Sequence, residues 1–428
     1  MTATFVSRQQ QPSLRRLAGI KASALFTALL RNCIGGFLAI ASLLACAPSE
    51  EPAGEPSGAE DVTRVAPKAE GASFFVPEDL PQLGTAELGT GIVDVLEELS
   101  EFEGVAVEAR NVMHPNGRLR YRKHVIVDAG GVEVDHGPDW RWWENGQIRF
   151  QRTWRHGKAD GPFKEWHKSG FQKSVGVLSA DLPTGVWERW FGTGEPKAWE
   201  EYLAGVREGL ELRWHKTGAF MHQKSWSAGV ENGLVRQWSP KGALLVDGVM
   251  VDGVKDGVWR EWWPGGVLQR SSSYLLGKPD GSWSEFYESG SGRVQGVYSD
   301  GLRDGLWEAW LESGQLVAVE NFQADKLHGQ RSVWAADGAL ISQGSYEGGE
   351  GVGVHEEWSP AGVLIMRRGY DDPPGADHVE RWWGDGSRRS VGLFIEGKRD
   401  GLWEAWTSAG EIDSQIAGLW RLGERVDG

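Results

Sequence analysis

A glycine pattern that returns every 24 residues constrains the fold of this chain more than any other feature. We take the glycine that starts each unit as position 0 and count along the unit from it. Glycine occupies position 0 in eleven of twelve units, with Asp377 in the other: Gly137, Gly161, Gly185, Gly209, Gly233, Gly257, Gly281, Gly305, Gly329, Gly353 and Gly401. Position 9 is glycine in all twelve units, from Gly146 to Gly410. This period predicts an array in which each unit packs on its neighbours, instead of the two or three compact domains usual for 428 residues.

Aromatic and aliphatic residues recur at three further positions of the unit. Position 5 is Phe286 in one unit and tryptophan in the others: Trp142, Trp166, Trp190, Trp214, Trp238, Trp262, Trp310, Trp334, Trp358, Trp382 and Trp406. Position 11 is aliphatic in seven units: Ile148, Leu244, Leu268, Leu316, Leu340, Leu364 and Ile412. Position 17 is aromatic in nine units: Trp154, Tyr202, Trp226, Tyr274, Tyr298, Phe322, Tyr346, Tyr370 and Phe394. These spacings do not follow the helical period of about 3.6 residues.

Two strands of six or seven residues with two turns fit one unit. Position 7 is proline in three units, at Pro240, Pro264 and Pro360. Proline holds φ near about −65°, which excludes a type I′ turn at this place. A type I turn with the position 9 glycine in the left-handed region satisfies every unit. The resulting three-residue loop pairs position 6 with position 10 and position 5 with position 11.

This register predicts that the rings of positions 5 and 17 and the aliphatic residues of position 11 share one face of the sheet. The other face would carry charged residues and a partial tryptophan column at position 2. The five tryptophans of this column are our candidate binding patch: Trp187, Trp259, Trp283, Trp307 and Trp403. Alternatively, these rings pack against one another inside a coiled sheet.

The fold class expected from these patterns is all-β. We predict about 13 hairpin units over residues 104–428, forming one long, twisted, single-layer antiparallel sheet. A divergent unit precedes the regular ones, because Gly117 and Leu119 match Gly146 and Ile148 after an insertion. Three extra residues after Gly410 bring Trp420 back onto the pattern.

The pattern G-x-W-x-x-W-x-x-x-G-x-L resembles the MORN-repeat variant family. Its clearest copies here begin at Gly257 and Gly305. The resemblance covers about three quarters of the chain and implies consecutive antiparallel hairpins that bind proteins or membranes. Bacterial members are often labelled antitoxin components, so the resemblance also implies an antitoxin-like role.

The beginning of the chain has the features of an export signal. Arg31 precedes an apolar run, residues 34–45, which is shorter than the ~20 residues needed to span a bilayer. The following Leu-Leu-Ala-Cys46 resembles the lipobox of bacterial lipoproteins, which implies cleavage before Cys46 and lipidation of its thiol. The alternative is an uncleaved anchor formed by residues 17–45. We expect a signal peptide at 1–45, a flexible tether at 46–73 and a short helical cap at 74–103, with Ile92, Val95, Leu96, Leu99 and Phe102 on its apolar face.

Composition and motifs narrow the function classes. Sixty acidic residues against 45 basic ones argue against nucleic acid as a partner. The ten histidines form no recognisable metal-ligand set, and no nucleophile elbow or phosphate loop is present. The Asp-Gly pairs before the strands are typical of turns. We therefore expect a protein without enzymatic activity and without a cofactor or bound metal.

Three functions fit this sequence. The first is a protein-binding scaffold that is exported and lipid-anchored in the bacterial envelope, at the outer membrane on its periplasmic or surface face. The second is binding of carbohydrate or peptidoglycan through the aromatic columns, and the third is the antitoxin-like role. Membrane attachment would run through lipidated Cys46, and the partner would be a protein.

Overall fold

The computed structural model describes residues 67–68, 81, 83–88, 99–371 and 375–427. The expected signal peptide, Cys46, and most of the expected tether and helical cap lie outside these residues. Two of the apolar positions assigned to the cap, Leu99 and Phe102, are described, and Phe102 lies in a strand. No helix among the described residues is long and apolar enough to cross a membrane.

The described chain is built from short strands joined by tight turns. The first ten are β1 (Glu101–Phe102), β2 (Val105–Ala106), β3 (Glu108–Met113), β4 (Leu119–Val127), β5 (Glu133–Trp142), β6 (Ile148–Arg155), β7 (Lys158–Trp166), β8 (Gln172–Ser179), β9 (Leu182–Trp190) and β10 (Pro196–Leu203). The next ten are β11 (Val206–Trp214), β12 (Phe220–Ser227), β13 (Val230–Trp238), β14 (Leu244–Val251), β15 (Val254–Trp262), β16 (Leu268–Leu275), β17 (Lys278–Phe286), β18 (Gly292–Ser299), β19 (Leu302–Arg303) and β20 (Gly305–Trp310). The last are β21 (Leu316–Gln323), β22 (Lys326–Trp334), β23 (Leu340–Glu347), β24 (Glu350–Trp358), β25 (Leu364–Tyr370), β26 (Asp377–Trp382), β27 (Arg388–Ile395), β28 (Lys398–Ala405), β29 (Gly418–Arg421) and β30 (Glu424–Arg425).

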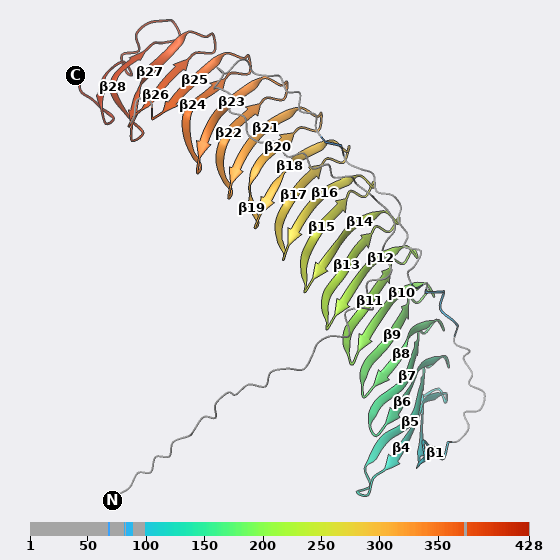
Figure 1. Ribbon diagram of the computed structural model, residues 1–428. Helices are drawn as coiled ribbons and strands as arrows, with labels where there is room; N and C mark the ends of the chain where they lie inside the picture. Colours follow the sequence, from blue (N-terminus) through green and yellow to red (C-terminus); the bar gives the residue numbers. More distant parts are fainter. Residues whose placement is uncertain (1–66, 69–80, 82, 89–98, 372–374, 428) are drawn as a thin grey trace, which may run out of the picture. The chain divides into compact units, whose positions relative to one another are not determined.

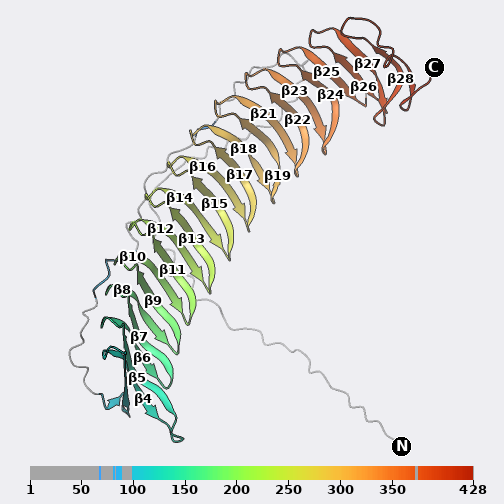
Figure 2. The same cartoon turned by 180° about the vertical axis from the view of Figure 1, so that it is seen from behind.

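One single-layer antiparallel sheet holds the strands from β3 to β30 (Figures 1 and 2). From β3 on, each strand pairs with the next one in the chain, except that β19 and β20 both pair with β18 and not with each other. Strands β1 and β2 pair only with each other. Among the described residues no pairing joins β3 to the last strands, so the sheet is open. The all-β hairpin array expected from the repeat is confirmed.

The turn inside each unit has the predicted geometry. In the first regular unit Trp142 pairs with Ile148, which are positions 5 and 11. The N–H of Gly146 donates to the carbonyl of Trp143 at 2.9 Å, and Gly146 has a φ of 90°. The divergent first unit repeats this arrangement, because Met113 pairs with Leu119 and Gly117 has a φ of 78°.

A second turn, which the sequence pattern did not specify, joins one unit to the next. Arg155 pairs with Lys158 across a two-residue loop whose residues His156 and Gly157 have φ values of 47° and 80°. These values are typical of a type I′ turn. The Asp-Gly pairs act on these turns across units, since the Asp280 carboxylate accepts the backbone N–H of Asp300 at 3.0 Å.

The predicted face of the position 17 rings is wrong, and a β-bulge explains why. Trp142 pairs with Ile148, but the preceding Arg141 pairs with Phe150, so Arg149 is left without a partner. The extra residue reverses which side of the sheet all later side chains occupy. Position 17 therefore shares a face with position 2, and Tyr298 lies at 5.0 Å between ring centroids from Trp307.

On one face, the position 5 rings form the expected column, with Trp190, Trp214 and Trp238 buried on successive hairpins. In six of the twelve regular units a polar ring at position 6 ties the hairpin to the next one. The indole N–H of Trp263 donates to the carbonyl of Phe286 at 3.2 Å, and Tyr287 donates its hydroxyl proton to the carbonyl of Trp310 at 3.0 Å. Histidines that looked scattered in the sequence share this role: Nε2 lies about 3 Å from the next carbonyl in His114, His167 and His215.

On the other face, the position 2 tryptophans lie flat on glycines of the preceding unit. A Cβ on Gly296 would lie 2.3 Å from the ring of Trp307. The indole N–H of Trp307 donates to the Val297 carbonyl at 3.1 Å. The same pairs recur as Trp187 on Gly176, Trp259 on Gly248 and Trp403 on Gly392. Each ring therefore needs both a glycine and a carbonyl of its neighbour.

One unit departs from this arrangement and shows what it requires. Trp283 faces Ser272, whereas each of the other four position 2 tryptophans faces a glycine. Its ring is only half-buried, and its N–H donates to the Glu285 carboxylate at 3.1 Å instead of to a backbone carbonyl. A side chain at position 15 therefore displaces the ring from its covered site.

We predict that Gly296→Ala lowers the free energy of unfolding by about 1–3 kcal/mol, because the added methyl group overpacks the Trp307 site. Urea unfolding followed by circular dichroism measures this. Ser272→Ala is the matched control, since Trp283 already accommodates a Cβ there, and its cost should be smaller. Equal stability of Gly296→Ala and the parent protein would contradict the account of this contact.

Candidate functional site

The expected binding patch at position 2 is mostly covered. Trp187, Trp259, Trp307 and Trp403 have exposed fractions of 7%, 5%, 8% and 1%. Only Trp283 is partly accessible. The prediction of an exposed aromatic patch is wrong for the four buried rings, and the alternative of packing within the sheet describes them. The physical reason is that each indole covers a glycine of its own sheet.

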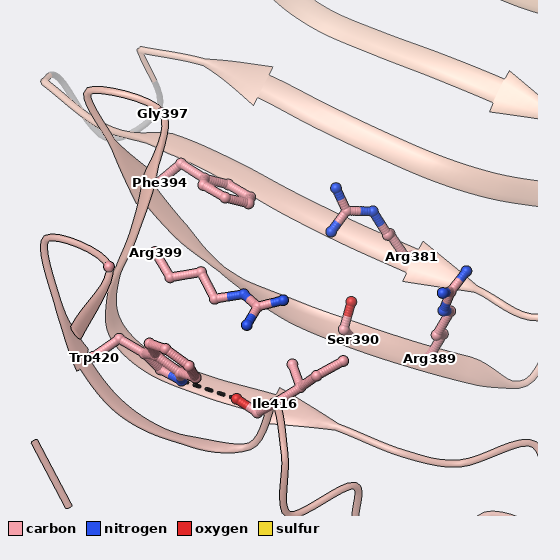
Figure 3. A pocket seen from close by; sticks show the side chains of 9 residues that line it. Arg381, Arg389, Ser390, Phe394, Gly397, Arg399, Ile416 and Trp420 are labelled. Carbon is pink, nitrogen blue, oxygen red and sulfur yellow. Dashed lines mark hydrogen bonds between the residues drawn. The ribbon is translucent and has the colours of Figure 1, made fainter. Parts of the chain in front are cut away.

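A cationic cavity lies at the C-terminal end of the array (Figure 3). Its volume is about 520 Å³. Arg381 comes from β26, Arg389 and Phe394 from β27, Arg399 from β28 and Trp420 from β29. Antiparallel pairing of these consecutive strands brings the five side chains around one space. Ser390, Gly397, Ile416 and Gly423 complete the lining.

The three arginines of the cavity have aromatic neighbours but no acidic partner. None of them forms a salt bridge with a residue in the described part of the chain. The Arg399 guanidinium lies 5.1 Å from the ring centroid of Trp403 and 5.0 Å from that of Trp420. Arg389 lies 4.6 Å from the ring of Trp383. Burial, together with the nearby positive charges of Arg389 and Arg399, lowers the pKa of Arg381 below its ordinary value.

One earlier unit, which begins at Gly185, contains two of these arginines with their counter-charges present. Its Arg189 and Arg207 occupy the positions that Arg381 and Arg399 occupy in the unit that begins at Asp377. There the Glu200 carboxylate, with an exposed fraction of 1%, lies 2.6 Å from Arg189 and 3.4 Å from Arg207. Glycine replaces this glutamate at Gly392 in the C-terminal unit.

A second buried carboxylate is also missing from the cavity. Glu211 lies 3.1 Å from Arg207, and its counterpart beside Arg399 is Trp403. Burial opposes ionisation of Glu211, but hydrogen bonds with His222 and Arg213 and the charge of Arg207 lower its pKa to about 2. The C-terminal unit thus keeps the cations of this network and lacks both of its anions.

The cavity is closed on one side by the insertion that interrupts the repeat. Two extra residues, not the expected three, lie between Gly410 and Trp420, because Gly401 pairs with Trp420 as Gly137 pairs with Trp154. Ile416 from this segment lines the cavity. The Trp420 indole N–H donates to the Ile416 carbonyl at 2.9 Å, which holds the segment against β29 (Figure 3). The cavity therefore occurs where the regular repeat ends.

Sequence reasoning did not single out this site. Two signals were present in the sequence: the insertion after Gly410, and a unit with basic residues at positions 4, 12 and 22 but no acid at its position 15 or at position 2 of the next unit. Neither signal identifies a cavity, because the basic residues come to lie on one face only when the β-bulge at position 12 is known. The described residues contain no group of three or more His, Cys, Asp or Glu side chains able to hold a metal ion.

We predict that Glu211→Gln lowers the free energy of unfolding at neutral pH by roughly 1.5–3 kcal/mol, the usual contribution of hydrogen bonds to a charged group. Because the folded-state pKa lies below the unfolded value, the carboxylate stabilises the fold above about pH 4.5 and loses this effect as pH falls to about 2. The difference between the variant and the parent protein should therefore shrink over this interval. Urea titrations at several pH values measure it.

Glu188→Gln serves as the control, because the pKa of Glu188 is shifted in the direction opposite to that of Glu211. Burial raises the pKa of Glu188, so its ionisation opposes folding, and the glutamine variant should be no less stable than the parent protein at neutral pH. A constant difference between Glu211→Gln and the parent protein from pH 6 to pH 2 would contradict the electrostatic account.

Comparison with known proteins gives little similarity. No protein-family model matches the chain, and no curated protein matches it. Among solved structures, three crystal structures of TcdB2-TccC3 align with 71–76% of this chain at 9–11% sequence identity, each with a TM-score of 0.15. One of the three includes Cdc42, and another lacks the hypervariable C-terminal region. The chain spans only 19–25% of the length of those chains.

Proposed function

We propose that this chain is an exported, lipid-anchored protein of the bacterial envelope whose hairpin array serves as a scaffold for a protein partner. The basic leader, its short apolar run and the Leu-Leu-Ala-Cys46 sequence support export and anchoring. The resemblance to the MORN-repeat variant family supports the binding role. The array supplies a long series of similar rungs, which suits recognition of an extended surface.

The cationic cavity is the observation that carries the binding role. Arg381 and Arg399 correspond to Arg189 and Arg207, which bind the buried carboxylate of Glu200 within the sheet. A carboxylate supplied by a partner would restore in the C-terminal unit the pairing that the earlier units make internally. Arginine binds carboxylates through two parallel hydrogen bonds, which gives such a site geometric selectivity.

The surroundings of the cavity favour a carboxylate on an otherwise apolar segment. Phe394, Ile416 and Trp420 line the space beside the guanidinium groups. The net charge of −15 repels acidic ligands elsewhere on the molecule, so the cavity is a local exception to the field of the chain.

The two other functions have less support. Stacking on sugar rings requires exposed aromatic faces, and the position 2 tryptophans are mostly buried. The antitoxin-like role comes from the family resemblance alone, and an export signal separates such a protein from a cytoplasmic toxin.

We predict that a hexaglutamate peptide binds the protein at low salt and that Arg399→Gln weakens this binding by roughly tenfold or more, as expected for loss of a charged hydrogen-bond donor. Isothermal titration calorimetry measures the affinity. A hexaglutamine peptide should not bind. Failure of the parent protein to bind hexaglutamate would refute the assignment of the cavity.

Arg303→Gln is the matched control for this experiment. Arg303 occupies the same repeat position as Arg399 and also lies on an aromatic ring, Phe322, but it pairs with Asp325 at 2.9 Å. Its loss should leave hexaglutamate affinity unchanged. Equal weakening by both variants would show that the peptide responds to net charge and not to the cavity.

The anchor is tested separately. In protein purified from bacterial membranes, mass spectrometry should find Cys46 as the first residue, with diacylglycerol on its thiol. Cys46→Ser should release the protein from the membrane fraction. A mature chain that retains residues 17–45, or an unmodified Cys46, would contradict lipoprotein processing and favour the uncleaved anchor.

A further inference from the structure

The aliphatic column at position 11 has gaps. Seven units carry leucine or isoleucine there, and five carry another residue: Gln172, Pro196, Phe220, Gly292 and Arg388. Position 11 lies between the position 5 rings of two neighbouring units, so a missing aliphatic side chain exposes those rings unless another group covers them.

A piece of the chain from before the array covers the gap at Gln172. The backbone N–H of Ala86 donates to the Gly194 carbonyl at 2.8 Å, and the Gln172 N–H donates to the Glu87 carbonyl at 3.1 Å. The Trp190 indole N–H donates to the Gly84 carbonyl at 2.9 Å. Leu88 forms an antiparallel bridge with Phe171. Residues 83–88 are therefore held by backbone hydrogen bonds across two units.

The burial of the position 9 glycines agrees with this contact between residues 83–88 and the array. Among the twelve position 9 glycines, only Gly170 and Gly194 are buried, and these lie in the two units that residues 83–88 contact. Ala86 is itself buried against them. The remaining position 9 glycines are half-buried or exposed.

A second piece of the same segment covers the gap at Gly292. Lys68 forms an antiparallel bridge with Ser291. A Cβ on Gly292 would lie 2.6 Å from Cδ of Pro67 and 3.0 Å from its carbonyl oxygen. Pro67 thus takes the space of the missing leucine, and the adjacent rings Phe286 and Trp310 are buried. At the gap of Arg388, by contrast, no described residue from before the array forms a bridge or a backbone hydrogen bond.

We propose that residues 67–68 and 83–88 form an intramolecular strap and that the gaps at Gln172 and Gly292 are its docking sites. Earlier residues of the strap dock further along the array, so the strap runs opposite to the order of the units. Pro67, the first described residue, therefore lies beside the seventh of the twelve regular units, not beside the first.

The position of Pro67 bears on how the protein is anchored. This consequence rests on the proposed lipidation of Cys46. Twenty residues lie between Cys46 and Pro67, so at about 3.5 Å per residue a lipidated Cys46 would lie within ~70 Å of the seventh unit.

Disulfide trapping tests the strap independently of lipid and of any ligand. The test uses the full chain with Cys33→Ser and Cys46→Ser, into which Lys68→Cys and Ser291→Cys are introduced. Bridge partners lie within the Cα separation that a disulfide spans, so a disulfide should form on mild oxidation. Non-reducing electrophoresis and mass spectrometry of the linked peptides measure its yield.

The matched control pairs Lys68→Cys with Ser387→Cys, which is a serine at the same repeat position beside the uncovered gap of Arg388. This pair should not crosslink. No disulfide in the first pair, or equal yields in the two pairs, would overturn the strap. These two outcomes would not contradict the proposed lipidation or the proposed role of the cavity, because the experiment involves no lipid and no ligand.

Restoring the aliphatic column gives a second test. Gly292→Leu should fill the space of Pro67 and reduce the yield of the Lys68–Ser291 cysteine pair at least fivefold, while circular dichroism shows the array still folded. Gly292 has no positive φ that would oppose the substitution. An unchanged disulfide yield in this folded variant would show that Pro67 does not occupy the gap.

Discussion

Outside the two places that residues 67–68 and 83–88 cover, each hairpin of this protein can bury its rings only against the hairpins beside it, and the rest of the structure depends on that constraint. A single-layer sheet has no second layer to cover its faces, so burial must come from side chains of adjacent rungs. The position 5 tryptophans cover one face, while the position 2 tryptophans cover glycines of the preceding unit on the other. Hydrogen bonds from position 6 rings and from indole N–H groups then fix each rung to its neighbour.

Much of this fold was predictable because the residues that determine it have special backbone requirements. Proline at position 7 and glycine at position 9 leave one turn type, and that turn sets the pairing of positions 5 and 11. The bulge at position 12 was not predictable, since its residues share no type: Arg149, Lys173, Met221, Gln269, Val317 and Ile365 are examples. Without the bulge, the repeat pattern predicts the position 17 rings on the wrong face of the sheet.

The same reason explains why the candidate site was missed. Arg381, Arg389 and Arg399 are visible in the sequence, but only the bulged register places them around one space with Phe394. The strap was equally hidden, because Lys68 and Ser291 are more than 200 residues apart and no periodicity connects them. In a repeat protein, departures from the pattern are informative: the missing glutamates mark the cavity, and the missing leucines mark the strap.

These departures lead to one view of how the protein works. Regular hairpins form the array, residues 67–68 and 83–88 cross it as the proposed strap, and the unit with the cavity would offer its guanidinium groups to the proposed partner. The earlier units show how such guanidinium groups are satisfied, through the carboxylates of Glu200 and Glu211.

In-frame deletion tests the dependence on neighbouring rungs most directly. Removing residues 305–328 deletes one whole unit and joins Asp304 to Gly329 in the correct phase. We predict that this shorter chain folds, keeps its strand signal in circular dichroism and unfolds cooperatively, whereas removal of residues 305–316 alone disrupts the sheet, because it leaves half a hairpin. Loss of structure in the whole-unit deletion, or equal tolerance of both deletions, would contradict the account.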